Sequence, residues 1–177
     1  MLITTVIFDF GNTLIKQQID DEHTLDELVL EPVEGASELI GRLSGGYRIG
    51  LLSNTKTSRE VHVRRAAMRL GWGRAFHCIV TSTDAGFEKP ALEIFHEILA
   101  RMGENPRNAI MVGNDLDADV RGAHEAGLLT AFFSCNPADW SALDMSDLRP
   151  DFVLQQLVDL ENVLDSLTSG SREQAST

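Results

Sequence analysis

The sequence predicts an α/β protein: a doubly wound three-layer sandwich built on a mostly parallel sheet. Nearly continuous apolar runs alternate along the chain with segments of helical apolar spacing. Such runs are typical of parallel strands, because helices cover both faces of a parallel sheet and every strand residue is then buried. The regular alternation implies right-handed crossovers between neighbouring strands, which generate this fold.

Each expected element has its own signal in the sequence. The expected strands are residues 2–9, 47–54, 76–82, 108–114 and 128–134, with a short last strand near 152–154. Helical spacing occupies 34–45, 57–71, 90–103, 117–127 and about 155–168. Pro90 suits a first helical position, and Gly71, Gly103 and Gly127 suit helix ends. We therefore expect one domain, with a core over residues 1–168.

Two segments fall outside the alternation. Residues 15–32 carry many acids and amides and few large apolar side chains, which favours a short cap or flap, either a solvated loop or a short helix. Residues 169–177 are polar and poor in apolar side chains, so we expect a disordered tail there.

Composition narrows the partners. The chain has 177 residues, 43% of them hydrophobic, and a formal charge of −12, which argues against nucleic acid or an anionic membrane as a general partner. Two cysteines are too few for a disulfide scaffold, so we expect reduced thiols and a cytoplasmic location. No apolar run is long enough to span a bilayer, and the N-terminal "MLITTVIF" is expected to be a strand and not a signal peptide. The oligomeric state stays open.

Polar side chains follow the expected strands where those strands end. Asp9 follows the first strand, Ser53 and Asn54 close the second, and Asn114 follows the fourth. Lys89 precedes the helix of "EKPALEIF". Ligands of open α/β sheets bind beyond the carboxyl ends of the strands, so these side chains are expected to form one site.

This set, in this order, resembles the haloacid dehalogenase-like hydrolase superfamily. Its usual elements are an aspartate nucleophile in a D-x-D-x-T setting, a serine or threonine, a lysine, and an acid pair in G-D-x-x-x-x-D. The resemblance covers roughly residues 2–134 and includes "VIFDFGNTLI" and "VGNDLDADV". It implies a Rossmann-like core with a minimal cap, and a magnesium-dependent phosphatase that works through an aspartyl phosphate.

The resemblance also implies a role for each site residue. Asp9 is expected to attack phosphorus and to bind Mg²⁺. Ser53 and the backbone amide of Asn54 are expected to donate hydrogen bonds to the phosphate, and Lys89 to supply a positive charge beside it. The side chains of Thr13 and Asn54 are equally compatible with fixing loop geometry. The expected metal ligands are Asp9, Gly11, Asn114, Asp115 and Asp119.

Two residues depart from the family pattern. Gly11 stands where the family has its second aspartate; a glycine carbonyl can still bind Mg²⁺, but no side chain remains to transfer protons. Loss of one acid–base group typically costs ~10²–10⁴-fold in rate. Asn114 replaces the first acid of the pair and offers a neutral carbonyl oxygen. Asp117 is expected to be a helix N-cap, and His23, in the flap, is the first candidate for a substitute acid.

Three functions remain open at this point. A phosphatase is favoured, acting on a small phosphorylated substrate or, because the short cap leaves the site open, on a bulky one. The alternative is a catalytically degenerate relative that binds a phosphorylated ligand or a protein partner. A metal-free dehalogenase is less favoured, because such enzymes rely on a large cap.

Overall fold

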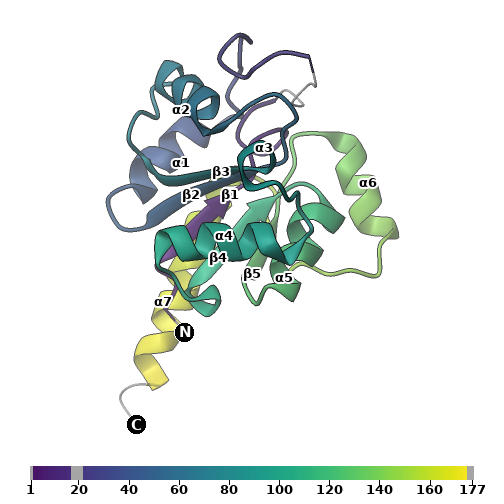
Figure 1. The fold of residues 1–177 in the computed structure, drawn as a ribbon. Coiled ribbons are helices and arrows are strands. Elements are labelled where there is room, and N and C mark those ends of the chain that lie inside the picture. Colours follow the sequence, from purple (N-terminus) through teal and green to yellow (C-terminus); the bar gives the residue numbers. More distant parts are fainter. Residues whose placement is uncertain (1, 17–21, 175–177) are drawn as a thin grey trace.

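A computed structural model describes residues 2–16 and 22–174 of the chain. Six parallel strands form one sheet in the order β3-β2-β1-β4-β5-β6 (Figure 1). The strands are β1 Thr5–Phe8, β2 Arg48–Ser53, β3 Phe76–Thr81, β4 Ala109–Gly113, β5 Leu129–Phe132 and β6 Phe152–Val153. The predicted α/β class and sheet type are confirmed, and each strand lies inside its expected range.

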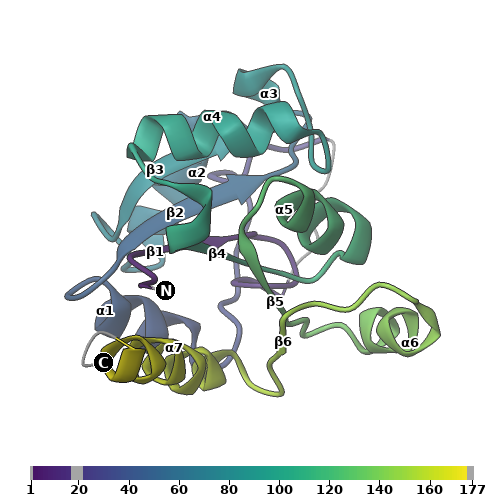
Figure 2. The ribbon, with the colours of Figure 1, turned by 90° about the horizontal axis from the view of Figure 1, so that it is seen from below.

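Helices cover both faces of this sheet, which gives the three expected layers (Figure 2). On one face lie α1 Ala36–Leu43, α2 Glu60–Arg69 and α7 Leu160–Gln174; on the other lie α4 Leu92–Met102 and α5 Gly122–Glu125. Two separate apolar cores result, because side chains alternate between the two faces of each strand. In β1, for example, Phe8 belongs to the first core and Ile7 to the second.

The ends of several helices differ from the expected ones. Pro90 precedes α4 instead of opening it, since Ala91 is the N-cap and the helix begins at Leu92. Gly103 ends α4 in a left-handed conformation, as expected. Residues 169–174, expected in the tail, continue α7, and residues 175–177 lie outside the described residues.

Three shorter helical segments lie between these elements. They are α3 Ser82–Ala85, the 3₁₀ turn η1 Pro106–Asn108 and the 3₁₀ turn η3 Leu157–Asp159. A fourth helix, α6 Pro137–Met145, was not expected and stands apart from the three layers beside β5 (Figures 1 and 2). Within the described ranges, no helix is both long and apolar enough to cross a bilayer.

Residues 22–32 of the expected flap contain no helix and pack against α2. Leu25 is fully buried in the first core, and its amide donates to the Ser58 hydroxyl at 2.8 Å. Asp26 forms an ion pair with Arg65, 3.3 Å apart, and its carbonyl accepts from Arg69. These contacts hold the segment down on the helical layer; residues 17–21 lie outside the described residues.

Candidate active site

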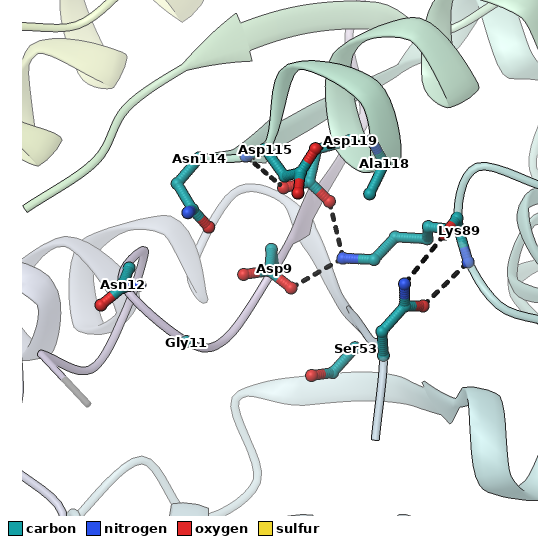
Figure 3. Close-up of a pocket in the computed structure, with 10 residues that line it drawn as sticks. Asp9, Gly11, Asn12, Ser53, Lys89, Asn114, Asp115, Ala118 and Asp119 are labelled. Carbon is teal, nitrogen blue, oxygen red and sulfur yellow. Dashed lines mark hydrogen bonds and ion pairs between the residues drawn. The ribbon is translucent and has the colours of Figure 1, made fainter. Parts of the chain in front are cut away.

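Parallel strands bring the predicted residues together at one edge of the sheet. Phe8 pairs in register with Leu51 of β2 and with Val112 of β4, so these three strands end side by side. The residues beyond those ends line a pocket of about 170 Å³ (Figure 3). They are Asp9, Gly11, Asn12, Ser53, Asn54, Lys89, Asn114, Asp115, Ala118 and Asp119. All eight residues to which the resemblance assigns catalysis, phosphate binding or metal binding are among them.

Lys89 lies at the centre of this pocket and is buried. Its Nζ donates to Asp9 Oδ1 at 2.7 Å, to Asp119 Oδ1 at 2.6 Å and to the Leu52 carbonyl at 2.9 Å. An ammonium group has three protons, so all its donors are used. Burial alone would lower the pKa of Lys89, but the carboxylates of Asp119 and Asp9 raise it above its usual value. The side chain therefore stays charged.

Asn54 holds the backbone of Lys89 in place. Its Oδ1 accepts from the Lys89 amide at 2.8 Å, and its Nδ2 donates to the Lys89 carbonyl at 2.9 Å. This pair of bonds fixes the residue whose side chain reaches Asp9. As expected for one of its two possible roles, the Asn54 side chain fixes loop geometry, and the residue also lines the pocket.

Asp119 is positioned by an irregular helix. Residues Leu116–Arg121 form the π-helix η2, in which the Val120 amide donates to the Asp115 carbonyl, five residues back, at 3.1 Å. Helical turns of this kind are rare and recur at functional sites. Asp119 packs over Gly113, where an added Cβ would lie 2.2 Å from Oδ2 of Asp119. Only glycine fits at position 113.

The expected N-cap of this helix was wrong by two residues. Asp115 is the N-cap: its Oδ1 accepts from the amides of Asp117 at 2.9 Å and of Ala118 at 2.8 Å. Asp117 is exposed and pairs with Arg121. Asp115 was expected only as a metal ligand, and its capping bonds engage one of its two oxygens.

Ser53 presents the feature that points most directly to a ligand. Its hydroxyl is fully buried, lines the pocket, and has no hydrogen-bond partner. A buried hydroxyl without a partner costs free energy, so such groups are normally satisfied or reserved for a ligand. The free hydroxyl faces the same pocket as Asp9, from the neighbouring strand. An acceptor-rich group placed between them would satisfy it.

The balance of charge in the pocket favours a cation. Asp9, Asp115 and Asp119 line it with one basic residue, Lys89. Burial raises the pKa of Asp119 to about 7, with Lys89 opposing the rise and the negative charge of Asp9 adding to it. An anionic ligand would meet this excess of negative charge, and a bound cation would remove the repulsion.

The oxygen donors available to a cation are few but suitable. Asp9 Oδ2 and Asn114 Oδ1 both lie 3.3 Å from the Thr13 hydroxyl, and Gly11 lines the same pocket. Carboxylate, amide and backbone oxygens are the ligands that Mg²⁺ takes. Among the described residues, no three His, Cys, Asp or Glu side chains are grouped to hold a metal, so a cation bound here would also need neutral oxygens.

Gly11 is not the strained residue of the first turn. The positive φ of 56° there belongs to Asn12, a residue type that tolerates it.

His23 is exposed, its carbonyl accepts from the Thr57 hydroxyl at 2.8 Å, and it does not line the pocket. The expectation of a histidine substitute therefore finds no support in this structure.

Comparison with known proteins agrees with this geometry. Residues 18–127 match the family of haloacid dehalogenase-like hydrolases. A glyceraldehyde 3-phosphate phosphatase of Methanothermobacter thermautotrophicus is 37% identical over 129 residues, which are 72% of this chain and 56% of that protein. The chain spans about half the length of the first curated relatives it matches.

Solved structures share the fold over nearly the whole chain. An uncharacterized protein from Listeria monocytogenes serotype 4b superposes with a TM-score of 0.80 and 26% identity, covering 94% of this chain and 99% of its own. A D,D-heptose 1,7-bisphosphate phosphatase of B. bronchiseptica, complexed with magnesium and phosphate, has a TM-score of 0.74 at 17% identity and covers 93% and 99%. The second likeness concerns the fold alone.

The buried ion pairs predict a large effect of Lys89→Met on stability. Removal of the ammonium leaves Asp9 and Asp119 buried without their cation, and breaking such a pair typically costs about 3–5 kcal/mol in the free energy of unfolding. Lys16→Met is the matched control, because Lys16 pairs with Glu31 at the exposed surface and such pairs contribute little. Urea denaturation in metal-free buffer measures both. Equal stability of the two variants would contradict this account of Lys89.

Proposed function

Because the chain belongs to the haloacid dehalogenase-like hydrolase family, we propose that it is a magnesium-dependent phosphatase that cleaves phosphate esters through an aspartyl phosphate on Asp9. One observation carries the proposal: the Asp9 carboxylate, held by Lys89 at 2.7 Å, shares a small pocket with the buried, unpartnered hydroxyl of Ser53. A nucleophile and a free donor that come from neighbouring strands and share one small space suit a phosphoryl group.

In the first half-reaction, a carboxylate oxygen of Asp9 attacks phosphorus, and the bond from phosphorus to the ester oxygen breaks. The leaving oxygen departs with the bonding electron pair. Ser53 donates its free hydrogen to a phosphoryl oxygen, and Lys89 offsets charge beside the nucleophile. Asn54 supports this arrangement by fixing the backbone of Lys89 through two hydrogen bonds.

In the second half-reaction, water attacks the phosphorus of the aspartyl phosphate, which releases phosphate and restores Asp9. Both steps are normally assisted by a group that moves a proton to the leaving oxygen and from the water. Position 11 offers no such group, because it is a glycine. We infer that the enzyme works best on esters whose leaving oxygen departs without protonation.

Mg²⁺ would be held by oxygens of Asp9, Gly11 and Asn114. Asp119 and Asp115 would contribute through the lone pairs that do not accept hydrogen bonds from Lys89 or from backbone amides. When bound, it neutralises charge between the carboxylate and the phosphoryl group. Positions 11 and 114 would supply neutral oxygens, so the negative charge around the ion would come from Asp9, Asp115 and Asp119. Lys89 remains the permanent cation beside Asp9.

The proposed substrate is phosphorylated and protrudes from the pocket. A volume of about 170 Å³ is below that of typical small-molecule sites, so it accommodates little beyond the phosphoryl group. No described residue of 22–32 lines the pocket, since this segment packs on α2. The Methanothermobacter thermautotrophicus relative is named a glyceraldehyde 3-phosphate phosphatase, which supports the class of reaction.

Phosphate release from a panel of esters, measured with Mg²⁺ and with a chelator, tests the proposal. We expect hydrolysis only with Mg²⁺, fastest for aryl and acyl phosphates, and loss of activity to background in Asp9→Asn. Asp117→Asn is the control, because Asp117 is exposed and outside the pocket. If the wild type binds Mg²⁺ and inorganic phosphate but hydrolyses no ester, the chain is a non-catalytic binder.

Gly11→Asp should restore the missing acid–base group. We expect turnover of an alkyl phosphate to rise by ~10²-fold or more, and that of an aryl phosphate to rise less, because a good leaving group needs no proton. The φ angle at Gly11 is not in the left-handed region, so an aspartate meets no backbone strain from φ there.

Gly11→Asn separates proton transfer from shape in this experiment. Asparagine has the size of aspartate but cannot exchange protons, so it should give no gain. Thermal melts of both variants establish that they fold. An equal gain in Gly11→Asn, or no gain in a folded Gly11→Asp that binds Mg²⁺, would contradict the assigned role of position 11.

A further inference from the structure

Asp139, in the first turn of α6, contacts the site through Asn114. Its Oδ2 accepts from Asn114 Nδ2 at 2.8 Å. Asp139 does not line the pocket, and nothing in the sequence pattern assigned it a role. We propose that Asp139 is a positioning residue: it orients the Asn114 amide so that the oxygen, not the nitrogen, faces the cation site. This inference rests on the magnesium site of the proposed function.

The direction of the amide follows from the chemistry of its partner. An ionised carboxylate only accepts hydrogen bonds, so the group of Asn114 that faces Asp139 must be the NH₂. The amide oxygen then lies on the opposite side, 3.3 Å from the Thr13 hydroxyl, which is also 3.3 Å from Asp9 Oδ2. Figure 3 shows this oxygen on the side of Asn114 that faces Asp9.

Asp139 is itself held firmly enough to impose that direction. The Ser134 hydroxyl donates to its Oδ2 at 2.5 Å, and Asn136 Nδ2 donates to its Oδ1 at 3.2 Å. Asn136 also caps α6 by accepting from the Ala138 amide. Trp140 secures the helix, since its indole donates to the Ser134 carbonyl at 2.9 Å and its ring packs edge-on to Phe132.

The need for Asp139 arises because residue 114 is an asparagine. An amide has one oxygen, and rotation by half a turn would present NH₂, which cannot bind a cation. A carboxylate at 114 would have two equivalent oxygens and would need no such control. Asp139 also keeps a negative charge within hydrogen-bond distance of the neutral ligand, which strengthens the ligand's oxygen as a donor to metal.

Binding of Mn²⁺, followed by electron paramagnetic resonance, tests this without turnover. Mn²⁺ takes the same oxygen ligands as Mg²⁺. We expect Asp139→Ala to weaken binding by ~10–100-fold, the usual effect of removing a residue that orients a metal ligand. Asp139→Asn should retain most of the affinity, because its amide oxygen can still accept from Asn114 Nδ2. Asp151→Ala, which removes an acceptor of Thr130 that contacts neither Asn114 nor the pocket in the described structure, is the control and should change nothing.

Asp139→Ala in the Asn114→Asp background shows whether Asp139 orients the side chain of residue 114 or only stabilises the loop. In Asn114→Asp, Asp139→Ala should cause no loss of Mn²⁺ affinity, because a carboxylate at 114 needs no orientation. An equal loss in both backgrounds would mean that Asp139 merely supports the loop, and would overturn the proposal. Thermal melts accompany each variant, and if Asp139→Ala fails to fold, Asp139→Leu replaces it in both backgrounds.

Asp9→Asn in this assay separates the inference from the proposed function. If wild-type binding is lost in Asp9→Asn but unchanged in a folded Asp139→Ala, the metal site stands and the role of Asp139 is wrong. If the wild type does not bind Mn²⁺, the metal site and the role of Asp139 both fail.

Discussion

The ammonium of Lys89 is the interaction on which the rest of this site depends. It joins Asp9 at the end of β1, the Leu52 carbonyl of β2 and Asp119 of η2, so three separate parts of the chain meet on one buried charge. Without this ammonium, each of the two carboxylates would be a buried charge with no cation beside it, which is strongly destabilising. The close approach of Asp119 in turn requires glycine at 113, and Asn54 is needed to hold the Lys89 backbone. Catalytic residues and fold are thus stabilised together.

The sheet and the site residues were predictable because their signals are local. Each strand is a continuous apolar run, and each site residue follows such a run, so parallel pairing alone places Asp9, Ser53 and Asn114 at one edge. The unpartnered hydroxyl of Ser53 and the buried charge of Lys89 are further evidence for a ligand site, and neither can be read from the sequence. They depend on burial, which arises only when distant segments pack.

The features missed by the sequence depend on contacts between distant residues. Helix α6 has no apolar stripe to reveal it, and its meaning lies in the bond from Asp139 to Asn114. Asp115, not Asp117, caps η2, because the helix begins at Leu116, ahead of the start expected from the sequence. Leu25 is buried although its acidic surroundings suggested a solvated flap, because Ser58, which precedes α2, and Arg65 and Arg69 of α2 bind this segment.

The central claim is that this site transfers phosphoryl groups to Asp9 without a general acid. The most direct measurement is kcat/KM for a series of aryl and alkyl phosphates whose leaving groups span a wide range of pKa. This ratio reports the first half-reaction, in which the leaving oxygen must carry its own charge. We predict that kcat/KM falls steeply and continuously as the leaving-group pKa rises. A flat dependence would show that a side chain protonates the leaving oxygen, and would contradict the account.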